Sequence, residues 1–307
     1  MTSPTLARRD LVGLTLAAAS WGLGTVISKR ALDEMPPLTL LPIQLAASLA
    51  VLAFLMRRRD MPFRGSPAML GRLGILNPGV AYALGLLGLG SISASLSVLL
   101  WAAEPLMILI LAAWLLRERV TPALVALSLM AVAGLALLVY DPTTSGQLLG
   151  VALTLAGVAC CASYTVATRR WIATSDSTAQ IVLAQQAHAL VFGVAVVGAV
   201  AILGGAIRPT SISAIGLVSA VASGVLYYAA AYWLYLTALR DVPASRAAIS
   251  FYLIPLFGVA GGILLLGERL DPRQWLGATV VLVAVLVIMF RPNPSRTAGM
   301  AVAPSGE

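Results

Sequence analysis

The chain has 307 residues, of which 60% are hydrophobic and only 10% are charged, and its formal net charge is +8. Soluble domains carry roughly 25% charged residues, so this composition excludes a water-soluble globular protein and indicates a membrane protein. The positive charge does not indicate nucleic-acid binding, because Lys and Arg stand at the ends of apolar blocks and form no basic stripe interleaved with aromatic residues.

Apolar blocks of about 20 residues, the length that crosses a ~30 Å hydrocarbon core as a helix, recur along the chain. Pro and Gly clusters and short charged runs separate them. The predicted transmembrane helices cover residues 10–31, 38–57, 69–89, 92–115, 122–140, 147–170, 179–204, 213–238, 243–267 and 273–291. The predicted fold class is therefore an all-α integral membrane protein of ten transmembrane helices, with short loops and a disordered cytoplasmic tail over residues 293–307.

The distribution of positive charge predicts the orientation of these helices. Of the 20 Lys and Arg residues, all but five fall on the side of the N-terminus when the helices alternate in direction. The five on the other side are Lys29, Arg30, Arg208, Arg269 and Arg273. Lys and Arg are enriched in cytoplasmic loops, so both termini are predicted to be cytoplasmic.

An internal duplication divides the chain into residues 1–142 and 143–292. At an offset of 150 residues, identical residues coincide. The matches are Ala94-Ser95 with Ala244-Ser245, Pro105 with Pro255, Glu118-Arg119 with Glu268-Arg269, and Tyr82 with Tyr232. Near the start of the halves the offset is 140 to 141, as for Gln44 and Gln185. Each half holds five predicted helices, an odd number, so the second half is predicted to be inverted relative to the first. Inverted repeats around a central cavity are typical of secondary transporters.

Several of these motifs resemble the EamA family of the drug/metabolite transporter superfamily. They are Trp21-Gly22 followed by Lys29, Pro105 followed by Glu118-Arg119, and Pro255 followed by Gly267-Glu268-Arg269. Within that family the chain is most similar to the YddG-type exporters of aromatic and neutral amino acids. Gln44 stands where many members carry Arg, so the resemblance does not extend to strongly anionic substrates.

The resemblance implies a basket of helices 1–4 and 6–9 around a central cavity, with helices 5 and 10 peripheral. It implies a bacterial inner-membrane protein that has the lipid bilayer and a small-molecule substrate as partners and needs no cofactor. Because one chain already contains both halves, we expect it to function as a monomer.

Polar and aromatic side chains inside apolar helices are costly unless they face a cavity or a partner, so they are the substrate-binding candidates. The aromatic candidates are Trp21, Tyr82, Trp101, Tyr164, Tyr227, Tyr228, Tyr232 and Tyr252. The polar candidates are Gln44, Asn77, Glu104, Gln185 and His188. Pro78, Pro105 and Pro255 are predicted helix breaks or hinges.

Each candidate has a structural alternative. The aromatic residues could simply pack, and the two glutamines could hold helices together instead of binding a zwitterion. Glu104 is either a proton-coupling carboxylate or a neutral acid bonded to a neighbouring helix, and His188 is either a proton relay or a packed residue. Lys29 and Arg30 either reach out to the membrane interface or attract carboxylates into the cavity mouth.

Three hypotheses of function follow. The first is a secondary transporter that exports neutral or aromatic amino acids by alternating access. The second is a broad metabolite or drug exporter coupled to protons through Glu104. The third, a membrane enzyme or receptor, would need a cluster of carboxylates, a metal site or an activated nucleophile, and the sequence predicts no catalytic residue and no metal ligand.

Overall fold

The computed structural model describes residues 8–58, 68–115, 122–139, 147–168, 178–205, 207, 212–238, 250 and 253–290. Within these residues the regular secondary structure is helical and no strand occurs. The elements of the first half are α1 (Arg8–Leu32), α2 (Pro37–Arg58), α3 (Ala68–Gly74), η1 (Ile75–Val80), α4 (Ala81–Ser91), α5 (Ala94–Trp101), α6 (Glu104–Leu115) and α7 (Pro122–Val139). Those of the second half are α8 (Gln147–Thr168), α9 (Thr178–Ile202), α10 (Ala214–Gly224), η3 (Val225–Ala230), α11 (Ala231–Ala238), α13 (Leu253–Leu266) and α14 (Pro272–Phe290).

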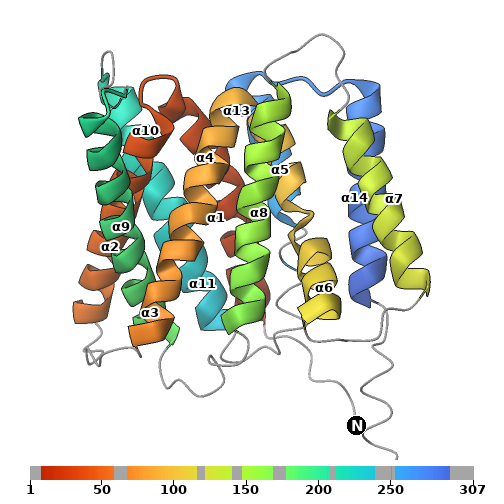
Figure 1. Ribbon diagram of the computed structural model, residues 1–307, viewed down its shortest axis with the longest axis horizontal. Helices are drawn as coiled ribbons and strands as arrows, with labels where there is room; N and C mark the ends of the chain where they lie inside the picture. The colour runs from red at the N-terminus through yellow and green to blue at the C-terminus, as the bar shows by residue number, and fades with distance from the viewer. Residues whose placement is uncertain are drawn as a thin grey trace, which may run out of the picture.

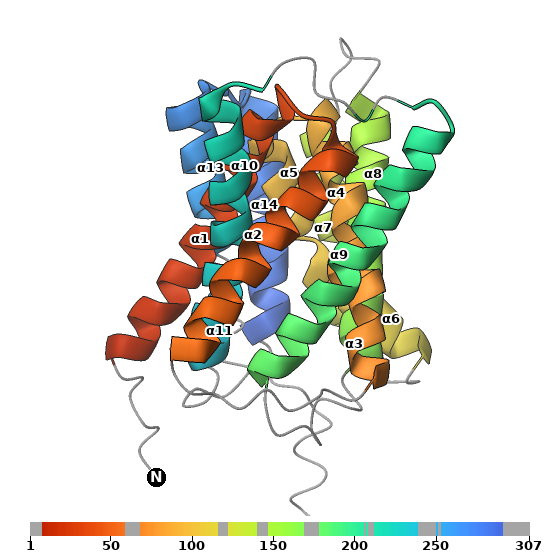
Figure 2. The same ribbon diagram turned by 90° about the vertical axis from the view of Figure 1, so that its left-hand side faces the viewer.

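Most helix ends lie within one to three residues of the predicted spans. Six helical segments among the described residues are long and apolar enough to cross a membrane. The helices run side by side between two faces of a bundle (Figure 1), and α1 begins at the lower face in the view of Figure 2. In the view of Figure 2, α2 lies between α10 and α9 and packs against both. The predicted tail over residues 293–307 lies outside the described residues.

Three predicted spans are interrupted rather than continuous. A kink within η1 and the π-helical segment η3 divide the spans predicted at 69–89 and 213–238, and the two segments lie 150 residues apart. Within η1, Asn77 has a non-helical backbone (φ −143°, ψ 117°) directly before Pro78. The span predicted at 92–115 ends its first part at Trp101 and resumes at Glu104 as α6. Pro105 is the second residue of α6. Backbone N–H groups in the first turn of a helix make no intrahelical hydrogen bond, so proline costs none at this position.

Helices α7 and α14 pack on one another at one edge of the bundle (Figure 1). At Gly134 of α7, an added Cβ would lie 3.0 Å from the carbonyl oxygen of Gly277 in α14. This close approach pairs the two helices along their length. Their position agrees with the peripheral placement that the family resemblance implies for helices 5 and 10.

Glycines also let backbones meet at the centre of the bundle. A Cβ added to Gly224, the last residue of α10, would lie 2.5 Å from the carbonyl oxygen of Gln44 in α2. A Cβ added to Gly74, the last residue of α3, would collide with the carbonyl group of Gln185 in α9. The two contacts involve residues that the internal offsets pair, Gly74 with Gly224 and Gln44 with Gln185.

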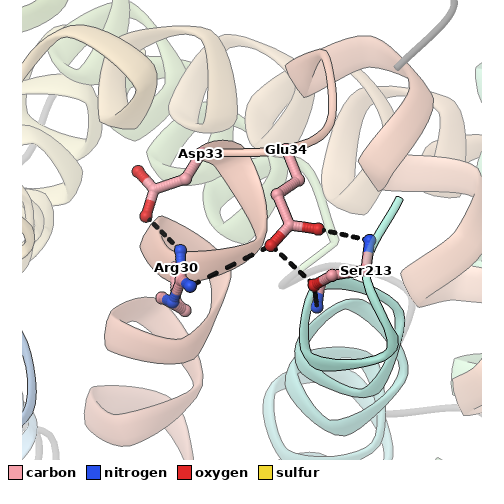
Figure 3. Close-up of polar contacts among 5 residues, drawn as sticks. Arg30, Asp33, Glu34 and Ser213 are labelled. Atoms are coloured by element: carbon pink, nitrogen blue, oxygen red, sulfur yellow. Dashed lines mark hydrogen bonds and ion pairs between the residues drawn. The ribbon is translucent and has the colours of Figure 1, made fainter. Parts of the chain in front are cut away.

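The face opposite the N-terminus, which we call the Glu34 face, is held by two carboxylates at helix N-termini. Glu34 accepts hydrogen bonds from the backbone N–H and the hydroxyl of Ser213, each at 2.8 Å, at the start of α10 (Figure 3). Glu268 accepts from the backbone N–H groups of Ala94 at 2.6 Å and Ser95 at 2.8 Å, at the start of α5. Exposed N–H groups and the helix dipole both favour a negative charge there. We call these two contacts the carboxylate caps.

Both carboxylate caps join segments from different halves of the chain. Gly267, with φ +67°, follows the last residue of α13 and turns the chain so that Glu268 points to α5. Glu34 is further fixed by Arg30, whose guanidinium lies 3.9 Å from it and 2.8 Å from Asp33 (Figure 3). The caps therefore tie the two halves together at the Glu34 face.

The glycine contact at Gly224 predicts a strong packing effect. Gly224→Ala should lower stability by about 1–3 kcal/mol, because α10 and α2 would have to move apart. The matched control is Gly198→Ala in α9, where an added Cβ meets nothing within 4 Å. Thermal unfolding of both variants in detergent measures the difference, and equal stability of the two would contradict the packing described.

The Glu34 cap predicts a pH-dependent contribution to stability. Hydrogen bonds from the Ser213 backbone N–H and hydroxyl lower the pKa of Glu34 below its ordinary value of 4.5, and Arg30 adds to this shift. The stabilisation is therefore full above about pH 4.5, declines below it, and is lost once the pH has fallen through the lower folded-state pKa. Glu34→Gln should melt at a lower temperature than the parent protein at pH 7.

Thermal scans across this pH range provide the check. The gap in melting temperature between Glu34→Gln and the parent should close in acid. Asp33→Asn, which removes only an exposed partner of Arg30, should show a smaller gap at pH 7. A Glu34→Gln gap of constant size from pH 7 to pH 3 would show that the carboxylate does not act through its charge.

Candidate functional site

A small cavity lies between α1, α4, α5 and η3. Its volume is about 30 Å³, and it is lined by Thr25, Ser28, Tyr82, Gly85, Leu86, Leu89, Ser97, Trp101, Tyr227 and Tyr228. Thr25 and Ser28 of α1 lie one helical turn apart on the same face. Leu89 belongs to the end of α4 that reaches the Glu34 face, so the cavity extends from the aromatic side chains toward that face.

Tyr82 lies at the centre of a group of aromatic rings. Its ring centroid is 5.5 Å from that of Trp101, 5.3 Å from that of Tyr227 and 5.4 Å from that of Tyr228. Edge-to-face and tilted contacts of this kind are each worth about 0.5–1.5 kcal/mol beyond the area they bury. Gly85, one turn after Tyr82, leaves room for Trp101, because an added Cβ would lie 3.0 Å from the indole ring.

Tyr82 and Tyr232 meet at their hydroxyl groups, whose oxygens are 3.1 Å apart. The Tyr232 ring also packs edge-on against Trp21 of α1, with centroids 5.5 Å apart. We call Trp21, Tyr82, Trp101, Tyr227, Tyr228 and Tyr232 the aromatic cluster. It offers apolar ring faces together with hydroxyl and indole N–H groups, a combination suited to solutes with one polar and one apolar part.

Gln44 connects three helices. Its side-chain amide nitrogen donates to the hydroxyls of Ser28 in α1 at 2.8 Å and Ser223 in α10 at 2.7 Å. Both serines donate in turn to carbonyl groups of their own helices, which identifies the nitrogen as the shared donor. The Oε1 atom of Gln44 is buried and has no hydrogen-bond partner among the described residues. The structure therefore gives Gln44 a helix-joining role, and Ser28 links it to the cavity wall.

Gln186, one residue beyond the candidate Gln185, supports the interrupted helix that carries Tyr228. Its amide nitrogen donates to the Tyr228 carbonyl at 3.0 Å, and its oxygen accepts from Ser48 of α2 at 2.6 Å. A π-helical segment displaces carbonyl groups from the regular α-helical pattern, so they need other donors. Gln186 thus holds the cavity-lining Tyr228 in place from α9.

The other polar candidates of α8 and α9 lie outside the cavity wall. Gln185 accepts a hydrogen bond at 2.9 Å from the hydroxyl of Tyr164, which joins α9 to α8. His188 places its Nδ1 atom 2.8 Å from the Ala184 carbonyl oxygen of its own helix. The His188 ring packs against Gly71 of α3, where an added Cβ would lie 2.9 Å from it. The contacts of His188 are those of a packed residue.

Glu104 opens α6 after the interruption at residues 102–103. Its carboxylate accepts a hydrogen bond from the Cys161 thiol of α8, with sulfur and oxygen 3.2 Å apart. Among the described residues, no Lys or Arg lies within ion-pair distance of Glu104. The Glu104 carboxyl group thus faces α8, three residues after Trp101, and has no cation beside it within the described part of the chain.

The remaining candidates are placed less fully. Asn77 is buried in η1, and its Oδ1 atom has no hydrogen-bond partner within the described part of the chain. Pro255 is buried in the first turn of α13. Tyr252 lies outside the described residues, and for Pro105 only the backbone is described. No group of three or more His, Cys, Asp or Glu side chains that could hold a metal ion occurs among the described residues.

Sequence reasoning missed several side chains of this site: Thr25, Ser28, Ser97 and Gln186. Trp21, Thr25 and Ser28 recur at helical spacing, a signal that places them on one face of α1. Nothing in the sequence distinguishes Gln186 from Gln185, because their roles depend on which neighbouring helix each one faces.

Comparison with known proteins gives matches over nearly the whole chain. The EamA-like transporter family matches residues 10–140 and again residues 148–290. A probable amino-acid metabolite efflux pump of Escherichia coli is 26% identical over 292 residues, which cover 93% of this chain and 96% of that protein. An uncharacterized transporter of Archaeoglobus fulgidus is 25% identical over 289 residues, covering 90% of this chain and 97% of that protein.

A shorter match and a structural match complete the comparison. The uncharacterized transporter YwfM of Bacillus subtilis is 35% identical over 86 residues, which make up 28% of this chain and 29% of that protein. A crystal structure described only as that of a protein superposes with a TM-score of 0.63 at 18% sequence identity, over 93% of this chain and 99% of the other. At this identity the likeness concerns the fold alone.

Proposed function

Because the chain belongs to the EamA-like transporter family, we propose that it is a secondary transporter that exports small metabolites, with neutral and aromatic amino acids as its main substrates. The name of the Escherichia coli relative, an amino-acid metabolite efflux pump, supports this substrate class. So does the aromatic cluster, which matches an apolar side chain next to polar groups. We propose that one chain works alone, as a monomer in the inner membrane of a bacterial cell.

The proposed architecture has ten membrane crossings in two inverted repeats, residues 1–142 and 143–292. The two family matches, residues 10–140 and 148–290, support this division. The interruptions at η1 and η3, which lie at an offset of 150 residues, support it as well. So do the paired glycine contacts, in which each half contributes the glycine to one contact and the glutamine to the other.

The observation that carries the proposal is the contact between Tyr82 and Tyr232. These residues are equivalent in the two repeats, and their hydroxyl oxygens are 3.1 Å apart. Equivalent atoms of two repeats can meet only beside the axis that relates the repeats. The cavity next to this contact therefore lies at the proposed repeat interface, where secondary transporters bind their substrates.

The size of the cavity implies movement. A volume of about 30 Å³ is far below the roughly 300–1,000 Å³ of small-molecule sites. An amino acid therefore enters only when the helices that carry the aromatic cluster move apart. We propose that the repeats rock about the cavity. With both termini cytoplasmic, as the excess of Lys and Arg on that side favours, the Glu34 face is external and the carboxylate caps hold it closed.

Glu104 supports a second candidate function, a broad metabolite or drug exporter coupled to protons. Glu104 contacts α8 and has no cation at ion-pair distance among the described residues, and such a carboxyl group can bind and release a proton during transport. It lies beside the interruption between α5 and α6, where a movement of Trp101 would change its surroundings. The third hypothesis, an enzyme or receptor, has no supporting group of side chains among the described residues.

Amino-acid flux in proteoliposomes tests the first candidate. The protein should show saturable flux of phenylalanine, and Tyr82→Ala or Trp101→Ala should lower its rate at low substrate concentration by about tenfold, equal to ~1.4 kcal/mol of lost binding. Trp275→Ala, which removes an exposed indole on α14, should leave the rate unchanged. Flux of sugars or nucleotide sugars with none of the twenty amino acids would refute the proposed substrate class.

A pH gradient tests the second candidate. If Glu104 couples transport to protons, an imposed gradient should accelerate substrate flux, and Glu104→Gln should remove that acceleration while leaving flux down a substrate gradient. Asp271→Asn, which changes an exposed carboxylate at the start of α14, is the matched control and should keep the acceleration. A parent protein whose flux ignores the pH gradient would rule out proton coupling by this carboxyl group.

A further inference from the structure

Lys29 does not itself line the cavity but contacts its wall on the side of the Glu34 face, through the carbonyl group of Leu89. It follows Thr25 by one helical turn and is next to Ser28, and both of these residues line the cavity. Its ammonium group donates to the carbonyl oxygens of Leu89 at 2.8 Å and Gly90 at 3.3 Å, at the end of α4. Leu89 lines the cavity as well. Lys29 therefore bridges α1 and α4 on this side of the cavity.

Lys29 and its neighbour Arg30 have different hydrogen-bond and ion-pair partners. Arg30 pairs with the carboxylates of Asp33 and Glu34. Lys29, in contrast, has no carboxylate within ion-pair distance in the described part of the chain, although Asp33 and Glu268 act on it from farther away. Both oxygens of Glu268 accept hydrogen bonds from α5. The direct partners of Lys29 are thus neutral carbonyl groups that carry only the partial negative charge of a helix end.

A zwitterionic α-amino acid is complementary to both sides of this contact. A carboxylate binds an ammonium group more strongly than a neutral carbonyl does, because the hydrogen bond joins two opposite charges. The Leu89 and Gly90 carbonyls, once released by Lys29, become acceptors for the ammonium group of the same amino acid. The substrate side chain then extends along the cavity toward Tyr82 and Trp101.

We propose that Lys29 binds the carboxylate of the transported amino acid, and that the end of α4 binds its ammonium group after exchange with Lys29. This inference rests on the proposed function and adds the part of the substrate that the site recognises. A compound that lacks either charged group would satisfy only one side of the contact. The site therefore selects zwitterions over amines and over carboxylic acids with the same side chain.

The experiment compares phenylalanine with phenethylamine, which lacks the carboxylate, and 3-phenylpropanoate, which lacks the ammonium group. Each compound is added to the purified protein in detergent, and binding is measured by the rise in melting temperature, a readout that does not need transport. The parent protein should bind phenylalanine at least roughly tenfold more tightly than phenethylamine, the range expected for a hydrogen bond between charged groups. The same three compounds are then tested as competitors of phenylalanine flux.

Three variants separate recognition from folding. Lys29→Met should weaken phenylalanine binding to the level of phenethylamine. It should not weaken phenethylamine binding, because the amine no longer competes with Lys29 for the Leu89 and Gly90 carbonyls. Lys29→Arg, which keeps the positive charge, should retain the preference for phenylalanine. Arg30→Met is the matched control, because it removes the neighbouring cation that is already paired, and it too should retain the preference.

The failure of this inference differs from the failure of the proposed function. If the parent protein transports phenylalanine and Lys29→Met keeps the parent preference over phenethylamine, or loses affinity for both compounds equally, Lys29 does not recognise the carboxylate. If the parent protein transports none of the twenty amino acids, the proposed substrate class itself is wrong.

Discussion

The structure depends on the requirement that backbone N–H and C=O groups within hydrocarbon be hydrogen-bonded inside the protein. This requirement favours uninterrupted helices and makes each interruption costly unless other groups take over. The described interruptions adjoin cavity-lining residues: η3 carries Tyr227 and Tyr228, η1 ends two residues before Tyr82, and residues 102–103 directly follow Trp101. At η3 the cost is offset by Gln186, whose amide group donates to the Tyr228 carbonyl. The irregular backbone is thus found where side chains of neighbouring helices support it and where it shapes a cavity.

Close packing of helices supplies the second condition for the site. Within a membrane the hydrophobic effect does not drive helices together, because lipid tails are as apolar as the helix surfaces. Association of helices therefore depends on van der Waals contact and on polar groups between them. Gly224 and Gly74 bring backbones together, and the Gln44 amide joins α2 to α1 and α10 through two serines. These contacts position Ser28 and the tyrosines of η3 around the same small space. The central aromatic cluster is therefore held by neighbours that are small or polar, and its rings fill the space between them.

Charged groups have a distinct role at the Glu34 face. Glu34 and Glu268 lie at helix N-termini, and Lys29 lies at a helix C-terminus, so each charge interacts with the end of a helix dipole of opposite sign. The two carboxylates join the halves of the chain, whereas Lys29 joins two helices of one half. In the proposed transport cycle these contacts are the ones that must change when the Glu34 face opens. These contacts are hydrogen bonds and not packed apolar side chains. Hydrogen bonds can be exchanged for bonds to water or to substrate groups.

The sequence by itself determined the positions of the helices, because a helix that crosses hydrocarbon needs a long apolar segment and Pro or charged residues mark its ends. It also determined the family, through the motifs at Trp21, Pro105, Pro255 and Glu268, and it singled out Tyr82 and Tyr232 as equivalent residues. Only the tertiary structure decided that these two tyrosines touch, that Gln186 rather than His188 supports the cavity wall, and that Glu34 and Glu268 reach across the two halves. The physical reason is that periodicity assigns a residue to a face of its own helix, whereas its partner depends on the rotation and spacing of helices that are distant in the chain.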